Sequence, residues 1–220
     1  MFNIYGNVQF VPGKYDAWQN AYDKLATYVA DAERNSTLTY YFGVPVEFEG
    51  NHSATPHMLA FEVYNTREDL YDTHLKSPAM GEFLVTVPDS MSTGLDLTHY
   101  TETSGFLDKS TNCRECKIIY DTQIVCNSAQ DRDTILAKLA AVAKHAEEKE
   151  EDTYTFLVQK SLDNETHVRI FERYASWAAM ESHQKSSVLV NFWLGSKGEI
   201  KSMEGRPYVP NNKGWLHHRV

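Results

Sequence analysis

The chain contains the same short phrase twice, about half its length apart. Residues 61–64 read FEVY and residues 171–174 read FERY. Each phrase is followed by a polar stretch, a histidine and, nine residues after the histidine, a phenylalanine: His74 and Phe83 in one case, His183 and Phe192 in the other. Repetition at half the chain length is typical of two copies of one domain. We therefore predict two repeats, residues 1–111 and residues 112–220.

Both repeats show the same order of predicted elements: strand, helix, strand, strand, helix, strand. In the first repeat, residues 18–32 carry apolar side chains spaced three and four apart, which predicts an amphipathic helix. β-branched and aromatic runs predict strands at 3–11, 37–46, 57–64 and 94–100. The second repeat predicts strands at 116–126, 153–160, 168–174 and within 200–209, with a long helix at 131–148. Shorter helical stretches are predicted after residues 66, 78, 176 and 187.

This element order is that of the ferredoxin-like βαββαβ unit, a four-stranded antiparallel sheet with helices on one face. An apolar second face must be covered, and two such sheets packed face to face form a barrel-like core. We therefore predict an α+β fold in which two ferredoxin-like repeats make an intramolecular version of a dimeric α+β barrel.

Composition narrows the classes of partner. The net charge of −9 argues against nucleic acid or an anionic membrane surface as the main partner. No apolar run approaches the ~18 residues that a membrane-spanning helix needs. The N-terminus lacks the basic and apolar regions of a signal peptide, so we expect a cytoplasmic protein.

The chain has three cysteines, an odd and low number that fits a reducing compartment. Cys113 and Cys116 have C-x-x-C spacing, which in other settings indicates a redox or zinc motif. No second pair completes a zinc site, and the motif falls at the joint between the repeats. We therefore expect two linker thiols and no bound metal.

Two polar side chains in the first repeat are candidates for chemistry. His74 follows Leu70 by four residues on a predicted helix, so both side chains point toward the sheet. A histidine side chain suits proton abstraction from a phenol. Glu62 lies mid-strand among apolar residues, and burial of an unpaired carboxyl there would raise its pKa. For both residues a purely structural role, pinning helix to sheet or accepting from a tyrosine hydroxyl, remains the competing explanation.

Other residues are candidates for ligand contacts. Tyr64, Tyr40 and Phe61 belong to an aromatic sheet that would sandwich a planar aromatic molecule, or would simply form core. His99 on the last strand of the first repeat would face a cavity. The recurrence of His183 in the second repeat indicates either shared chemistry or shared architecture.

The first repeat combines the FEVY phrase, the helix cap, His74, Ser77-Pro78 and Phe83. This combination resembles the antibiotic biosynthesis monooxygenase domain family of dimeric α+β barrels. The likeness covers most of residues 4–100. The second repeat fits more loosely, because it has Arg173 in place of Val63 and one residue fewer before His183. The whole chain resembles the two-domain members found in fungi.

The resemblance implies a pseudo-dimer within one chain, since single-domain members pair to close the barrel; further association of chains is left open. It implies oxygenase chemistry on an electron-rich aromatic polyketide or quinol with O2, without metal or flavin, so we expect no cofactor. Haem-degrading relatives place an asparagine at the position of Asn7, which makes that residue a candidate for substrate contact. The histidine and tryptophan that those relatives also need are absent from the corresponding places.

We therefore expect a cofactor-independent monooxygenase with His74, Glu62 and Tyr64 in catalysis and Asn7, Tyr40, Phe61, His99 and His183 in substrate binding. The better motif match predicts the first repeat as the active half. Two alternatives stay open: a non-catalytic ligand-binding or stress-associated barrel, and an isomerase or cyclase on the same scaffold. An enclosed cavity with inward polar groups would separate the enzymes from a solidly packed barrel.

Overall fold

A computed structural model describes residues 1–109 and 114–217 of the chain. Of the described residues, 1–99 with 209–217 form one compact unit, and 100–109 with 114–208 form a second. The predicted repeat boundary, between residues 111 and 112, lies outside the described residues. Cys113, the first cysteine of the C-x-x-C motif, also lies outside them. The compact units differ from a simple division into halves because the last strand of each repeat runs on into the other unit.

The elements of the first repeat follow the predicted order, with two short 3-10 helices added in the loop before the third strand. They are β1 (Phe2–Gln9), α1 (Tyr15–Ala32), β2 (Thr37–Pro45), η1 (Val46–Phe48), η2 (His52–Ala54), β3 (His57–Tyr64), η3 (Asp69–His74), α2 (Pro78–Leu84), α3 (Val87–Ser90) and β4 (Leu97–Phe106).

The second repeat has the same order. Its elements are β5 (Ile118–Cys126), α4 (Ala129–Lys149), β6 (Thr153–Ser161), β7 (His167–Tyr174), α5 (Trp177–Gln184), α6 (Ser187–Leu194) and β8 (Ile200–Trp215). Both closing strands, β4 and β8, extend beyond the predicted ends at residues 100 and 209. In β4, the extension to Phe106 continues the ladder with β6.

Within each unit the third strand of the repeat lies between the first and second. β3 pairs antiparallel with β1 and β2, and β7 pairs antiparallel with β5 and β6. In the second unit, β4 also pairs antiparallel with β6, and β8 with β5.

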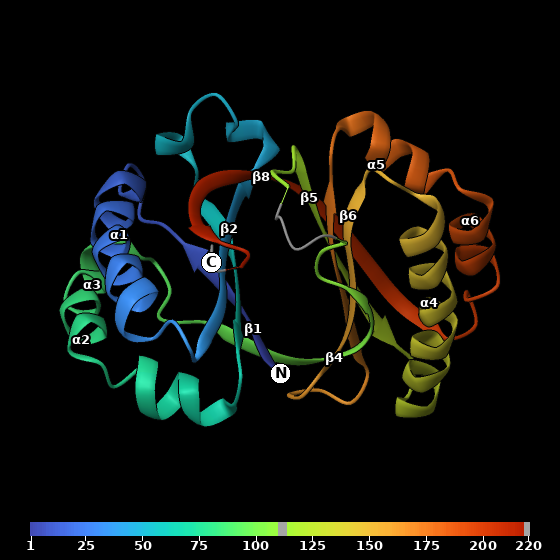
Figure 1. The fold of residues 1–220 in the computed structure, drawn as a ribbon, viewed down its shortest axis with the longest axis horizontal. Helices are drawn as coiled ribbons and strands as arrows, with labels where there is room; N and C mark the ends of the chain where they lie inside the picture. Colours follow the sequence, from blue (N-terminus) through green and yellow to red (C-terminus); the bar gives the residue numbers. More distant parts are fainter. Residues whose placement is uncertain (110–113, 218–220) are drawn as a thin grey trace. The chain divides into compact units, whose positions relative to one another are not determined.

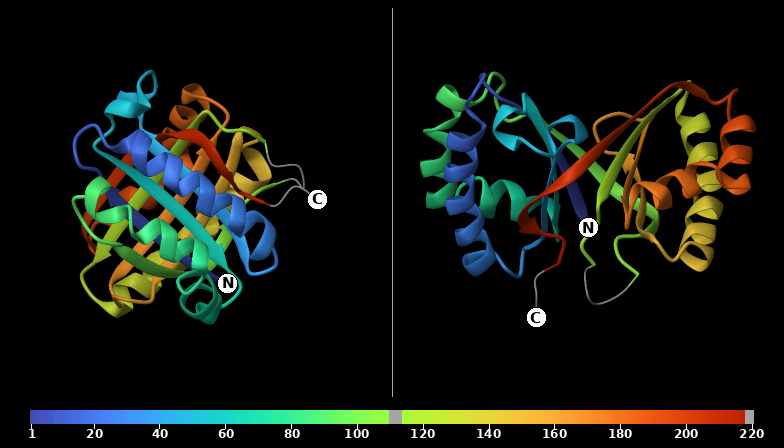
Figure 2. Two further views of the ribbon diagram at one scale, coloured as in Figure 1. Left: turned by 90° about the vertical axis from the view of Figure 1, so that its left-hand side faces the viewer. Right: turned by 90° about the horizontal axis from the view of Figure 1, so that it is seen from above.

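The helices of each unit cover one face of that unit's sheet. Figure 1 shows α1, α2 and α3 on one side of the strands of the first unit, and α4, α5 and α6 on one side of the strands of the second. The left view of Figure 2 looks onto α1 and α2, which lie side by side across the strands. This arrangement leaves the space between helices and sheet as the place for a site.

The unequal spacing between the two copies has a structural cause. Residues 69–74 form a π-helical segment, closed by a hydrogen bond of 2.8 Å from the Leu75 amide to the Leu70 carbonyl. The second repeat has one residue fewer between Tyr174 and its histidine, and there α5 is a regular α-helix. The extra residue is absorbed as a single π-turn, and both histidines stay buried.

Gly214 occupies a position that no other residue fits. Its φ of 72° lies in the left-handed region, and a Cβ atom there would lie 1.9 Å from the carbonyl oxygen of Tyr40. We expect Gly214→Ala to lower the free energy of unfolding by about 2–4 kcal/mol, from backbone strain plus displacement of β2. Urea denaturation measures it. Gly81→Ala, at an open helical position, is the matched control and should be neutral or slightly stabilising; equal effects would contradict the assignment.

Candidate functional site

Strand β3 directs a carboxyl group toward the helices of the first unit. Glu62 pairs with Ile4 on β1 and with Tyr40 on β2, so it is on the central strand of the sheet. Since side chains alternate along a strand, Tyr64 shares its face. Phe61 points to the opposite face, where it stacks on Tyr5 with ring centroids 4.9 Å apart.

Both oxygens of Glu62 accept hydrogen bonds from tyrosines. Tyr22 on α1 donates to one oxygen at 2.8 Å, and Tyr64 donates to the other at 2.7 Å. Burial raises the pKa of Glu62, while the nearby His74 and the two tyrosines lower it in part. Burial raises the pKa of Tyr22 and Tyr64 well above the ordinary value, so both stay neutral donors at neutral pH.

His74 is held by a second buried carboxyl group. Its Nδ1 lies 2.7 Å from Oε2 of Glu33, and the two side chains are 2% and 1% exposed. Glu33 is the C-cap residue of α1, and His74 is the last residue of the π-helical segment. In the neutral imidazole, an Nδ1–H donated to Glu33 leaves Nε2 as a proton acceptor.

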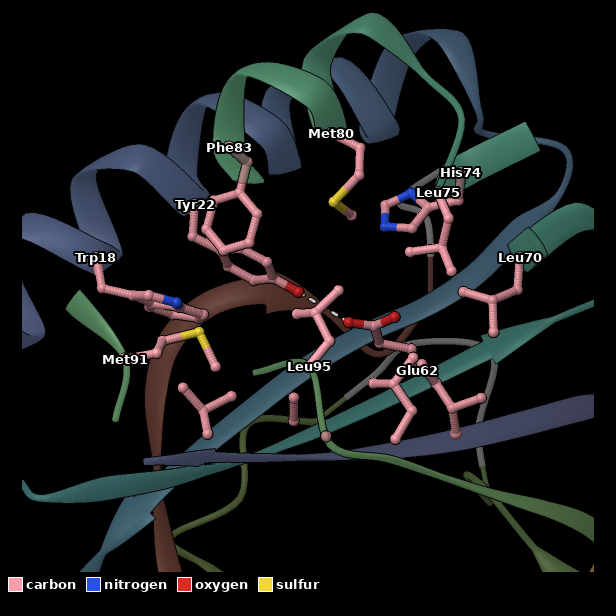
Figure 3. Close-up of a pocket in the computed structure, with 15 residues that line it drawn as sticks. Trp18, Tyr22, Glu62, Leu70, His74, Leu75, Met80, Phe83, Met91 and Leu95 are labelled. Carbon is pink, nitrogen blue, oxygen red and sulfur yellow. Dashed lines mark hydrogen bonds between the residues drawn. The ribbon is translucent and has the colours of Figure 1, made fainter. Parts of the chain in front are cut away.

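A small apolar cavity lies between the helices and the sheet beside these groups (Figure 3). Glu62, His74 and Tyr22 are its polar lining, and the labelled apolar lining includes Trp18, Leu70, Leu75, Met80, Phe83, Met91 and Leu95. The volume of this cavity is about 40 Å³. That is room for about two or three waters and is much less than the ~150 Å³ that holds a benzene ring.

The other predicted contact residues of the first repeat lie away from the lining of this cavity. Tyr40 is buried and stacks on Tyr22 with centroids 5.3 Å apart. Asn7 is exposed and donates to Asp96 at 3.3 Å. His99 is half-buried and lies 2.7 Å from the Tyr71 hydroxyl. Their roles in substrate binding stay predictions.

Two residues at the site were not singled out from the sequence, Glu33 and Tyr22. The available signal for Glu33 was an acidic residue at the end of the first helix of each repeat, Glu33 and Glu150. Tyr22 was assigned only to the apolar stripe of its helix.

The second repeat has the same arrangement around His183, within its own unit. Nδ1 of His183 lies 2.6 Å from Oε2 of Glu150, which follows α4 as Glu33 follows α1. The Tyr174 hydroxyl donates to Glu172, and Nε2 of His183 lies 4.0 Å from the same carboxyl oxygen. In both repeats, the tyrosine and glutamate of the repeated phrase and the histidine that follows it therefore form a cluster with a second glutamate, which follows the first helix.

No group of three histidine, cysteine, aspartate or glutamate side chains among residues 1–109 and 114–217 is arranged to hold a metal ion. In the same described residues, no helix is long and apolar enough to cross a membrane.

The pair of His183 and Glu150 predicts a pH-dependent stability. Burial would lower the pKa of His183, but the hydrogen bond to Glu150 and the charges of Glu172 and Glu150 raise it overall above 6.5. Burial would raise the pKa of Glu150, but the bond to His183 lowers it overall below 4.5. The stabilisation from His183 is therefore complete below pH 6.5 and lost as pH rises through its raised pKa. The Glu150 contribution is present above pH 4.5 and lost as pH falls through its lowered pKa.

We expect the difference in unfolding free energy between the native protein and His183→Gln to be largest near pH 5–6 and to shrink toward pH 9. Urea titrations at a series of pH values measure this difference. Subtracting the variant removes contributions from other groups that titrate in both proteins. A difference that grows with pH would contradict the ion pair.

The second repeat matches a known family by sequence. Residues 128–192, from the N-cap of α4 into α6, match the family model described as antibiotic biosynthesis monooxygenase. The predicted resemblance is thereby confirmed, although we expected the better match in the first repeat. No curated protein matches the chain.

Solved structures match the whole chain. A protein of Fusobacterium nucleatum, provisionally assigned as a monooxygenase, has a TM-score of 0.78 at 15% identity, covering 100% of this chain and 97% of that one. A protein of Lactobacillus acidophilus with the same provisional assignment has a TM-score of 0.74 at 14% identity, covering 99% and 95%. An anthrone oxidase-like protein has a TM-score of 0.67 at 10% identity, covering 100% and 95%.

These likenesses establish the fold, and they confirm the predicted α+β class with two ferredoxin-like repeats. The chain is a two-repeat α+β protein. Within its second repeat, residues 128–192 are similar to the antibiotic biosynthesis monooxygenase family.

Proposed function

We propose that the protein is a monooxygenase that oxidises a hydroxylated aromatic compound, of the quinol or anthrone type, with O2 and without a bound cofactor. The observation that carries this proposal is the buried His74, held by Glu33 and lying beside Glu62 in the wall of an apolar cavity. The family match and the monooxygenase-like names of the structural neighbours support the reaction class. The substrate class is our extension from the chemistry of the site.

The proposed reaction begins with proton transfer. Nε2 of His74 accepts the proton of a phenol or an activated C–H, while Glu33 fixes the ring through Nδ1. The carboxyl of Glu62 lines the same cavity as His74. Tyr64 holds Glu62 in place through its hydroxyl.

The substrate itself supplies the electrons. In the proposed sequence, the anion gives one electron to O2, the two radicals combine to a peroxide, and the O–O bond then breaks. For an anthrone, one oxygen atom enters the new carbonyl and the other leaves as water with the two methylene hydrogens. The apolar lining contributes by excluding water from the anion.

The cavity must widen before such a substrate enters. Met80 and Met91 line it, and methionine side chains adapt readily to different shapes. Leu95 also lines it and is 41% exposed, so movement of that side chain opens the cavity with little loss of burial. We place substrate contacts by Asn7, Tyr40, Phe61, His99 and His183 in the same proposal, as expectations from the sequence.

Oxygen uptake with a panel of hydroxyquinols and anthrones tests the proposal. We expect saturable uptake by the native protein and a loss of at least ~100-fold in His74→Ala, because a positioned base contributes about that factor. Tyr64→Phe should lower the rate by a smaller factor, since it removes one hydrogen bond to Glu62. Full turnover of every accepted compound by both variants would contradict the catalytic roles of His74 and Tyr64.

Two other functions would each give a different result in this oxygen-uptake experiment. Each unit contains a cavity lined by a buried carboxyl group, which favours ligand binding over a solidly packed barrel. Binding without oxygen uptake would indicate a ligand-binding protein. Conversion without oxygen uptake would indicate an isomerase or cyclase. We also propose a cytoplasmic location, consistent with the low number of three cysteines in the chain.

A further inference from the structure

The second unit contains a larger cavity than the first, in a corresponding place between its helices and its sheet. Its volume is about 220 Å³, against about 40 Å³ in the first unit, on the same measure. A cavity of ~150 Å³ holds a single benzene ring. The second cavity therefore has room for a two-ring aromatic molecule without rearrangement.

The two cavities also differ in which member of the repeated cluster faces them. His74 lines the first cavity, whereas in the second the lining contains Glu172 and not His183. The proposed proton acceptor is thus present at the first cavity only. The second cavity offers a carboxyl group, a hydroxyl group and apolar walls, which are the means of binding without the proposed base.

The carboxyl of Glu172 accepts from one tyrosine hydroxyl, whereas that of Glu62 accepts from two. Tyr22, eleven residues before Glu33, donates to Glu62 at 2.8 Å. Leu139, eleven residues before Glu150, stands at the corresponding place on α4 and has no hydroxyl. The oxygen of Glu172 that Tyr174 does not use has instead a contact of 3.3 Å from the Thr122 hydroxyl.

A second polar group faces the same space. Tyr120, which pairs with Glu172 across β5 and β7, lines the cavity together with Gln184. Gly205 on β8 makes room for this ring, since a Cβ there would lie 2.5 Å from the Tyr120 hydroxyl. Burial and the neighbouring Glu172 raise the pKa of Tyr120, so the hydroxyl is a neutral donor at neutral pH.

We infer that the cavity lined by Glu172 and Tyr120 is a second binding site, which takes a neutral two-ring aromatic compound carrying a hydroxyl group. The ligand hydroxyl donates to Glu172 and accepts from Tyr120. The rings lie among Phe156, Leu189 and Trp193. No lysine or arginine is among the lining residues and one carboxyl group is, so an anionic ligand is excluded on charge. This inference does not depend on the proposed oxidation, because binding is measured without oxygen.

Anaerobic calorimetric titration with 1,5-dihydroxynaphthalene tests the site. Naphthalene, which lacks hydroxyls, and naphthalene-1,5-disulfonate, which is an anion, are the comparison probes. We expect binding of the diol by the native protein, at least about tenfold weaker binding of naphthalene, and no binding of the disulfonate.

Variants locate the site. We expect Glu172→Gln and Tyr120→Phe each to weaken diol binding about tenfold by weakening or removing one hydrogen bond, and Glu82→Gln, a change at an exposed glutamate of the first repeat, to leave it unchanged. Absence of diol binding by the native protein, equal binding of the disulfonate, or equal effects of Glu82→Gln and Glu172→Gln would overturn the inference. If the diol binds as inferred but no compound drives oxygen uptake, the site stands and the proposed function fails.

Discussion

Glu33→Gln should lower kcat for oxidation of a hydroxylated aromatic by about 100-fold or more, with little change in KM. Glu33 does not line the cavity, but its carboxylate accepts from Nδ1 of His74 at 2.7 Å. A glutamine amide in its place donates to Nδ1, which leaves the proton on Nε2 and removes the acceptor. Such a change of histidine tautomer costs several orders of magnitude in serine proteases. Steady-state oxygen uptake measures the effect.

The second repeat supplies the control for this experiment. Glu150→Gln makes the same change to the pair with His183, whose hydrogen bond is 2.6 Å long. We expect a much smaller loss of kcat than for Glu33→Gln, because the proposal makes His74 the proton acceptor and gives His183 only a substrate contact. If Glu150→Gln abolishes turnover and Glu33→Gln does not, the active half is the second repeat.

Asp121→Ala should be the most destabilising of the side-chain changes considered, lowering the unfolding free energy by about 3–5 kcal/mol. Asp121 accepts two hydrogen bonds from Arg169, at 2.6 and 2.8 Å, and the side chains are 1% and 6% exposed. Removing the carboxylate leaves a buried guanidinium without its counter-charge. That loss costs far more than the pair contributes over an apolar replacement.

An exposed ion pair supplies the comparison for Asp121. Asp72 pairs with Lys76 four residues on, and both side chains are more than half exposed. We expect Asp72→Ala to leave the free energy of unfolding nearly unchanged. Urea denaturation of both variants at pH 7 gives the comparison. A difference between them of less than about 1 kcal/mol would show that Asp121 and Arg169 are hydrated rather than buried as a pair.

The fold could be predicted from the sequence because its signals are local and occur twice. The apolar spacing in 18–32 specifies a helix without reference to the rest of the chain. The Thr66–Asp69 cap does the same for the start of a second helical segment, and in it the Asp69 carboxylate accepts from the Thr66 amide at 3.0 Å. The lengths of β4 and β8 could not be predicted, since they depend on which strands each one pairs with. Gly105 and Gly214 lie beyond the predicted ends at residues 100 and 209, yet they belong to these strands and have positive φ.

The site could be predicted only in part. His74, Glu62 and Tyr64 were found because the repeated phrase contains them. Their partners Glu33 and Tyr22 lie 41 and 40 residues away from His74 and Glu62, and only tertiary packing brings them together. The difference in volume between the two cavities depends on which side chains fill the space between helices and sheet. No single sequence motif predicts that filling.

The most direct test of the monooxygenase account is the fate of isotopic oxygen. The purified, chelator-treated protein is incubated with an anthrone under ¹⁸O2, and the product is analysed by mass spectrometry together with the oxygen consumed. We predict one ¹⁸O atom in the new carbonyl, one O2 consumed per product, and loss of product formation in His74→Ala. Product that lacks ¹⁸O, or conversion without oxygen uptake, would contradict the account.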